Sequence, residues 1–90
     1  MERLELTFPS PDERYDSNRM VVTFWGQDGD KRVRCAISRD ALDDHFQGDN
    51  RDKLEIFRSN RKTIEEEARR KYLGRNTERD GSVLIRAADL

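Results

Sequence analysis

Residues 19–37 read RMVVTFWGQDGDKRVRCAI, and this stretch decides the fold. Its first seven residues are rich in β-branched and aromatic side chains, which favour a strand. Gly29 follows in a polar turn sequence and accepts the positive φ that a hairpin turn demands. Every second residue of 31–37 is apolar and is predicted to point inward, namely Val33, Cys35 and Ile37. The stretch therefore predicts a β-hairpin.

The first strand of this hairpin is apolar on both faces. One face would carry Met20, Val22 and Phe24, and the other Val21, Thr23 and Trp25. Both faces must be covered inside the molecule, or one must be presented to a partner. The face with Val21 and Trp25 therefore predicts a contact with an unknown protein partner or self-association as a homodimer.

On the N-terminal side, Leu4, Leu6 and Phe8 alternate with polar residues and predict a short half-buried strand. Pro9 and Pro11 would end it, because proline lacks the donor that a sheet ladder needs. Residues 12–18 are polar and read as a surface connection anchored by Tyr15.

On the C-terminal side, Ser38 is predicted to cap a short helix that ends at Gly48. Asp40 lies in its first turn, where the helix dipole favours a negative charge. The apolar side of this helix would consist of Ala41, Leu42, His45 and Phe46.

A longer helix is predicted over residues 50–73, with Asp49 or Asn50 as its cap and Gly74 as its stop. It carries one continuous stripe made of Leu54, Phe57, Arg61, Ile64, Ala68 and Tyr72. An alternative is two helices that meet near Asn60, because Ser59 and Asn60 weaken the middle and Thr63 with Glu66 resembles a capping box. We favour one helix.

Asp80 and Gly81 predict a turn, and residues 82–86 predict a closing strand. The order of elements indicates one α+β domain over residues 1–90. It would hold a small antiparallel sheet of the N-terminal strand, the hairpin and the C-terminal strand, with two or three helices packed on one face.

The composition limits which classes of partner and which cellular compartment are expected. The chain is 41% charged and 33% hydrophobic, and its net charge of −1 gives no general attraction to nucleic acid or anionic lipid. No apolar run approaches the length of a membrane span, and the first residues lack the apolar stretch of a secretion signal. The single Cys35 reads as a reduced, buried thiol, so we expect a cytoplasmic protein without membrane contact.

The sequence contains no recognisable catalytic, cofactor-binding or metal-binding constellation. One cysteine and one histidine cannot build a structural zinc site, and the glycines do not form a phosphate-binding loop. His45 would need a partner and a nucleophile within reach to act as a general base. We therefore expect a non-enzymatic protein with no cofactor.

Charged residues on the long helix offer a second candidate surface. Glu65–Arg69, Glu66–Arg70 and Glu67–Lys71 are spaced i,i+4 and predict a self-paired, solvated face. Arg61 on the apolar stripe would pair with an acid or bind a partner. The alternative function is nucleic-acid binding through the basic residues of this region: Arg58, Arg61, Lys62, Arg69, Arg70 and Arg75.

The whole chain resembles the bacterial family catalogued as domain of unknown function 1488. The likeness is carried by residues 8–9, 35–38, 41–46, 57–61, 64–65, 71–72, 80–85 and 89–90, in that order and spacing. The resemblance implies a compact α+β bacterial protein. It implies no activity, substrate or catalytic residue.

Overall fold

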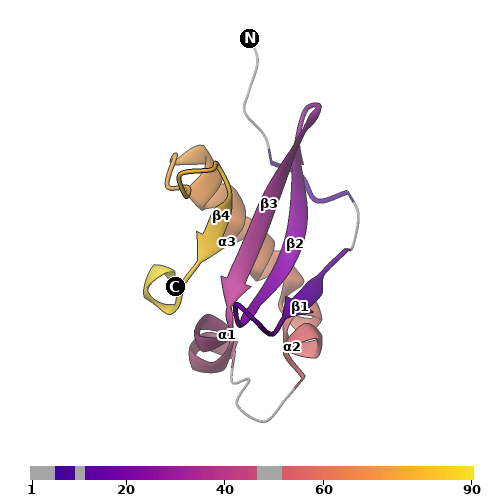
Figure 1. The fold of residues 1–90 in the computed structure, drawn as a ribbon, viewed down its shortest axis with the longest axis vertical. Helices are drawn as coiled ribbons and strands as arrows, with labels where there is room; N and C mark the ends of the chain where they lie inside the picture. The colour runs from indigo at the N-terminus through magenta and orange to yellow at the C-terminus, as the bar shows by residue number, and fades with distance from the viewer. Residues whose placement is uncertain (1–5, 10–11, 47–51) are drawn as a thin grey trace.

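A computed structural model describes residues 6–9, 12–46 and 52–90 (Figure 1). The sheet has four strands in the order of the chain: β1 (Arg14–Asp16), β2 (Val21–Asp28), β3 (Lys31–Ser38) and β4 (Val83–Ile85). The helices are α1 (Arg39–Phe46), α2 (Lys53–Ser59), α3 (Arg61–Leu73) and a final 3₁₀ turn, η1 (Ala87–Asp89). Behind the sheet in Figure 1 run α2 and α3, while α1 lies at its lower end. The α+β class is confirmed.

The predicted hairpin is confirmed. The two strands pair antiparallel along their whole length, from Asp28 opposite Lys31 to Val21 opposite Ser38. Gly29 has a φ of 60°, as the turn requires. This tight turn fixes the register, and the register places Trp25 directly opposite Arg34.

The segment before the hairpin differs from its prediction as a surface connection. Within it, β1 pairs antiparallel with β2, with Tyr15 opposite Val22. The Asp16 carboxylate accepts the amides of Asn18 and Arg19, and this side-chain turn folds the chain back on β2. Of the predicted N-terminal strand, Thr7 forms one isolated bridge to Gln27; Leu4 lies outside the described residues, as does Pro11.

The closing strand forms at 83–85, but it does not join as part of an antiparallel sheet. It pairs parallel with β3, and Cys35 lies opposite Val83. Three helices lie between the two strands in sequence, and such a crossover returns the chain in the same direction. The sheet is therefore mixed, though mostly antiparallel.

Two helices replace the favoured single helix, so the alternative of a break near Asn60 is the correct one. The Asn60 side-chain amide donates to the Ile56 carbonyl at 3.0 Å, which competes with the continuation of the helix. Thr63 and Glu66 do not begin a helix, because α3 already starts at Arg61. The first cap is Asp52, whose carboxylate accepts the amide of Leu54; Asp49 and Asn50 lie outside the described residues.

Two other helix ends, at Ser38 and Gly74, agree with their predictions. Ser38 caps α1 by accepting the amide of Ala41 at 3.1 Å. Gly74 is the C-cap of α3, and the left-handed residue after it is Arg75, with a φ of 58°. Asn76 N–H donates to the Lys71 carbonyl and Arg75 N–H to the Tyr72 carbonyl, which is the Schellman pattern. The predicted stop at Gly48 lies outside the described residues.

The core fills the space between the sheet and the helices. Its largest fully buried side chains include Phe57, Leu6, Ile37, Leu42, Ile56 and Ile64. Two placements predicted from the sequence are wrong: Met20 on the strand face of Val22 and Phe24, and His45 on the apolar side of its helix. Met20 is 48% exposed because it lies in the turn before β2 with a φ of 58°, where strand alternation does not apply. His45 is exposed at the last turn of α1.

Candidate interaction surface

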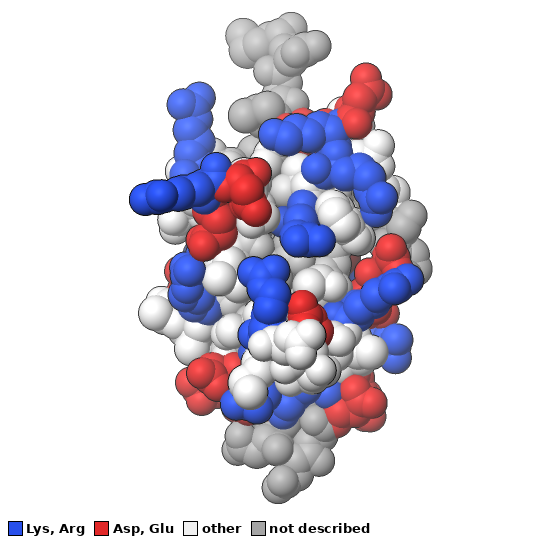
Figure 2. Space-filling model, in the orientation of Figure 1, with Lys and Arg blue, Asp and Glu red and all other residues white. Residues whose placement is uncertain are grey.

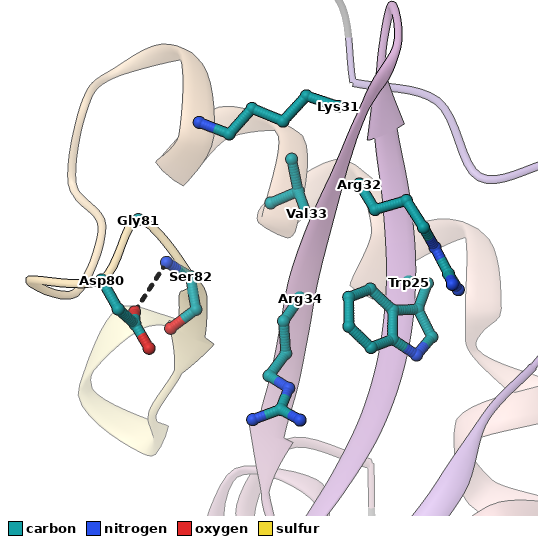
Figure 3. Close-up of a pocket in the computed structure, with 8 residues that line it drawn as sticks. All are labelled: Trp25, Lys31, Arg32, Val33, Arg34, Asp80, Gly81 and Ser82. Atoms are coloured by element: carbon teal, nitrogen blue, oxygen red, sulfur yellow. Dashed lines mark hydrogen bonds between the residues drawn. The ribbon is translucent and has the colours of Figure 1, made fainter.

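The outer face of the sheet, opposite the helices, carries the partly exposed Trp25. Its neighbours in sequence, Phe24 and Gly26, are buried on the inner face, so strand alternation turns the indole outward. The Arg32 guanidinium lies 4.3 Å from the indole centroid and the Arg34 guanidinium 5.7 Å from it. We call Trp25, Arg32 and Arg34 the Trp25 patch (Figure 3).

Val21, predicted to share an interaction surface with Trp25, is only 5% exposed. Ala36, which lies opposite Thr23 on the same face, is 6% exposed. Thr23 donates its hydroxyl proton to the Arg14 carbonyl at 3.3 Å, which ties this part of the face to β1. The end of the face near the hairpin turn is therefore the part that is available for contact.

Basic side chains predominate over the middle of this face, and acidic ones lie mostly toward its margins (Figure 2). The strand alternation places Arg14, Arg32 and Arg34 on the outer face. A symmetric dimer through this face would bring like charges together, which opposes pairing of two copies.

A hollow of about 240 Å³ adjoins the Trp25 patch. It lies between residues 31–34 of β3 and the turn at residues 80–82, as Figure 3 shows. Asp80 on the far wall accepts the amide of Ser82 at 2.9 Å, and hydrogen bonding with Ser82 holds the pKa of Asp80 below its ordinary value. The hollow is thus lined by three basic side chains and one acidic side chain.

Arg61 is engaged inside the molecule, as its position on the apolar stripe suggested. Its guanidinium donates to Glu13 at 2.7 Å, and Arg58 donates to the other oxygen of the same carboxylate. Burial alone would raise the pKa of Glu13, but the hydrogen bonds from Arg58 and Arg61 hold it below the ordinary value. The ion-pair interpretation of Arg61 is confirmed.

Two further candidates, Arg69 and Arg70, also lie on α3. The Arg69 guanidinium donates to the Leu6 carbonyl at 2.8 Å and lies over the Phe8 ring. Arg70 is highly exposed and approaches Glu67 at 3.7 Å, in place of the predicted pair with Glu66. The structure does not bring these arginines together with Trp25.

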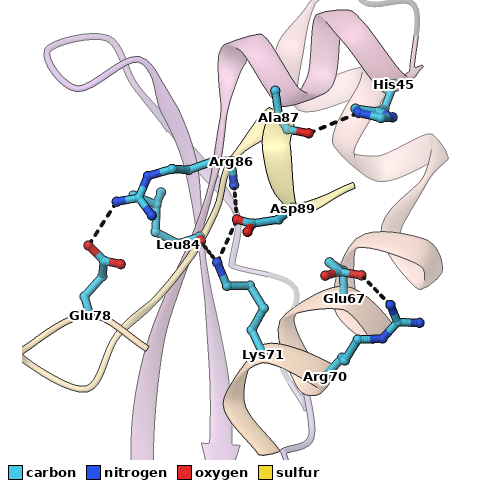
Figure 4. Close-up of polar contacts among 9 residues, drawn as sticks. All are labelled: His45, Glu67, Arg70, Lys71, Glu78, Leu84, Arg86, Ala87 and Asp89. Atoms are coloured by element: carbon cyan, nitrogen blue, oxygen red, sulfur yellow. Dashed lines mark hydrogen bonds and ion pairs between the residues drawn. The ribbon is translucent and has the colours of Figure 1, made fainter. Parts of the chain in front are cut away.

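Lys71 departs furthest from its predicted solvated role (Figure 4). Its side chain is 5% exposed and turns inward, where the ammonium donates to Asp89 at 2.7 Å and to the Leu84 carbonyl at 2.6 Å. The hydrogen bond from Lys71 lowers the pKa of Asp89. The predicted pair with Glu67 is wrong because the ammonium instead ties α3 to β4 and η1.

The two candidate nucleophile or base residues are poorly placed for chemistry. Cys35 is fully buried, as predicted, and burial raises its pKa to about 12. His45 has its Nε2 atom 3.2 Å from the Ala87 carbonyl oxygen. Within the described ranges, no three His, Cys, Asp or Glu side chains gather where they could hold a metal ion. In the same part of the chain, no helix has the length and apolar character to cross a membrane.

Sequence reasoning missed Arg32 and Arg34 as partners of Trp25. The signal was present, because the tight turn at Gly29 sets the register that places Arg34 opposite Trp25. It missed the hollow beside β3 because the parallel pairing of β4 leaves no local trace in the sequence.

The comparisons with known proteins agree with this fold. The structure resembles the crystal structure of a protein of unknown function from the DUF1488 family of Shewanella loihica PV-4. The TM-score is 0.81 and the identity 18%, over 94% of this chain and 96% of that one. No curated protein matches the chain. The family described as protein of unknown function DUF1488 matches residues 6–85, so the chain belongs to the DUF1488 family.

Proposed function

We propose that this chain is a non-enzymatic protein-interaction domain of the bacterial cytoplasm that binds its partner through the Trp25 patch. The observation that carries the proposal is the partly exposed indole held between two guanidinium groups. Tryptophan and arginine are the residues most enriched among those that dominate binding energy at protein interfaces. The Trp25 patch also presents a rigid apolar ring and positive charge at the same place.

The chemistry of Cys35 and His45 supports a role without catalysis. A thiol with a pKa of about 12 supplies almost no thiolate at neutral pH, and burial keeps reagents away from it. The imidazole of His45 meets a backbone carbonyl rather than a nucleophile that it could activate.

Nucleic-acid binding through the basic residues of α2, α3 and Arg75 is the second candidate, and it has weaker support. Arg58 and Arg61 are held by Glu13, and Arg69 is held by a backbone carbonyl. The isoelectric point near 5.8 also lies far below that of typical nucleic-acid-binding domains. Lys62, Arg70 and Arg75 are exposed and could still contact phosphates.

Photo-crosslinking from the outer face tests the proposal. A benzophenone side chain would replace Arg14, whose side chain is 82% exposed beside β2, and the matched control would replace Lys62 on α3. In the native host we expect a protein adduct of fixed mass from position 14, and its yield should fall at least five-fold with Trp25→Ala. A thermal melt of the Trp25→Ala protein shows whether that variant is folded.

Two outcomes would overturn the proposal. Equal adducts from positions 14 and 62 would show that the outer face has no special role. An adduct at position 62 that nuclease removes would favour the nucleic-acid function instead.

A further inference from the structure

The open edge of β3 is the feature that identifies how a partner could bind. All eight residues of β3 pair with β2, but only residues 35–37 pair with β4. Residues 31–34 therefore have a strand on one side only. In an antiparallel pair every second residue turns its N–H and C=O groups away from the partner strand. Outside the strand pairings, no backbone group in the described part of the chain bonds to residues 31–34.

The turn at residues 80–82 stays apart from this edge. Its own bonds are internal: Gly81 N–H donates to the Glu78 carbonyl, and Ser82 N–H donates to the Asp80 carboxylate. The hollow between this turn and residues 31–34 lies on the same side of β3 as β4, next to the start of that strand (Figure 3). An extended strand could lie there as an extension of the sheet.

The side chains around the open edge are mostly basic. Arg32 and Arg34 lie on the outer face with Trp25, while Lys31 and Val33 point to the other face. Asp80 is the acidic group on the opposite wall, and it already accepts the Ser82 amide. A strand with acidic residues on its outer side complements this arrangement.

We propose that the open edge of β3 binds an extended acidic segment of a partner protein by β-strand addition. This inference rests on the proposed function, and it specifies that the partner which contacts the Trp25 patch does so with an extended acidic segment. Backbone hydrogen bonds to residues 31–34 supply affinity, and the basic side chains of Arg32 and Arg34 beside the hollow supply specificity.

Fluorescence titration tests the inference directly, because Trp25 is the single tryptophan of the chain. The probes are four ten-residue peptides or oligomers: alternating Glu-Val, the same peptide with two central prolines, alternating Lys-Val, and single-stranded oligothymidine. We expect the Glu-Val peptide to change the emission and to bind at least ten-fold more tightly than the other three. Its affinity should fall as salt rises.

Arg32→Glu/Arg34→Glu should weaken binding of the Glu-Val peptide at least ten-fold. The matched control is Arg70→Glu, which reverses a highly exposed charge on α3 and should leave the affinity unchanged. Hydrogen exchange supplies a second readout, because strand addition should protect every second amide of residues 31–34. Side-chain contacts alone would leave these amides unprotected.

Three results would overturn the inference. Equal binding of the proline-containing peptide would exclude strand addition. Tighter binding of oligothymidine would assign the surface to nucleic acid. A dimer that forms through this edge, measured by sedimentation, would assign the edge to a second copy of the chain. If no acidic peptide binds while crosslinks from position 14 persist, the inference alone fails. If those crosslinks are also absent, the proposed function fails with it.

Discussion

Arg75 occupies the left-handed position directly after α3, where a side chain costs about 1–2 kcal/mol relative to glycine. Glycine is the usual residue there, and in this chain it lies one position earlier, at Gly74. We expect Arg75→Gly to raise the free energy of unfolding by about 1 kcal/mol, measured by urea denaturation. The control is Arg79→Gly, also in an exposed turn but without a positive φ, which should give no gain. A loss of stability in Arg75→Gly would contradict this account.

Cys35 is expected to be inert in the folded protein. Its side chain is fully buried and its pKa is about 12. At pH 8 the thiol is therefore almost entirely protonated, and reagents cannot reach it. Ellman's reagent should release no thiolate in native buffer and one equivalent in 6 M guanidinium chloride. Rapid reaction of the native protein would show that the thiol is accessible and would reopen the question of a chemical role.

At the scale of elements, the buried ammonium of Lys71 joins α3 to the C-terminal elements β4 and η1. We expect Asp89→Ala to cost about 3 kcal/mol, because it leaves a buried charge without its carboxylate. Lys71→Met/Asp89→Ala should be more stable than Asp89→Ala alone, because no charge is then left unpaired. Thermal unfolding of both single variants and the double variant measures the coupling. Strict additivity would show that the pair is unimportant.

The elements also show where sequence reasoning succeeds. The hairpin could be predicted because a turn residue and strand alternation act over a few positions and agree with each other. The break between α2 and α3 is harder to predict, because it depends on the direction taken by the Asn60 side chain. Strand β1 was missed because its pairing depends on the Asp16 side-chain turn more than on apolar alternation.

At the scale of the whole molecule, carboxylates with shifted pKa values link stability to pH. The pKa values of Glu13, Asp80 and Asp89 are lowered on folding, so their contribution to stability is present above the ordinary values and is lost as pH falls through the folded ones. The pKa of Glu65 is raised by burial, which offsets part of this loss. We expect the urea midpoint to fall from about pH 5 downward.

Glu13→Gln isolates one of these groups. It should cost about 2 kcal/mol at pH 7, because charge-assisted bonds from Arg58 and Arg61 are weakened, and its cost should shrink at pH 3. Asp44→Asn, at an exposed position on α1, is the control and should leave the pH profile unchanged. A cost that stays constant between pH 7 and pH 3 would exclude Glu13 as a source of the pH dependence.

The candidate surface could be predicted only in part. The outward placement of Trp25 follows from alternation within one strand, and the structure agrees. Three other features depend on how neighbouring strands are placed: the low exposure of Val21, the guanidinium groups beside the indole and the open edge of β3. Parallel pairing between strands so distant in the chain leaves no periodic signal within either strand.

The same parallel pair sets an order for folding. Residues Cys35 and Val83 are opposite each other although they lie about fifty positions apart, and closing so long a loop costs entropy before any contact offsets it. The hairpin closes through two residues and can form within microseconds. Before β4 docks, the edge of β3 is therefore bare along its full length. In that interval Lys31, Arg32 and Arg34 act as gatekeepers, since their repulsion opposes edge-to-edge aggregation of newly made chains.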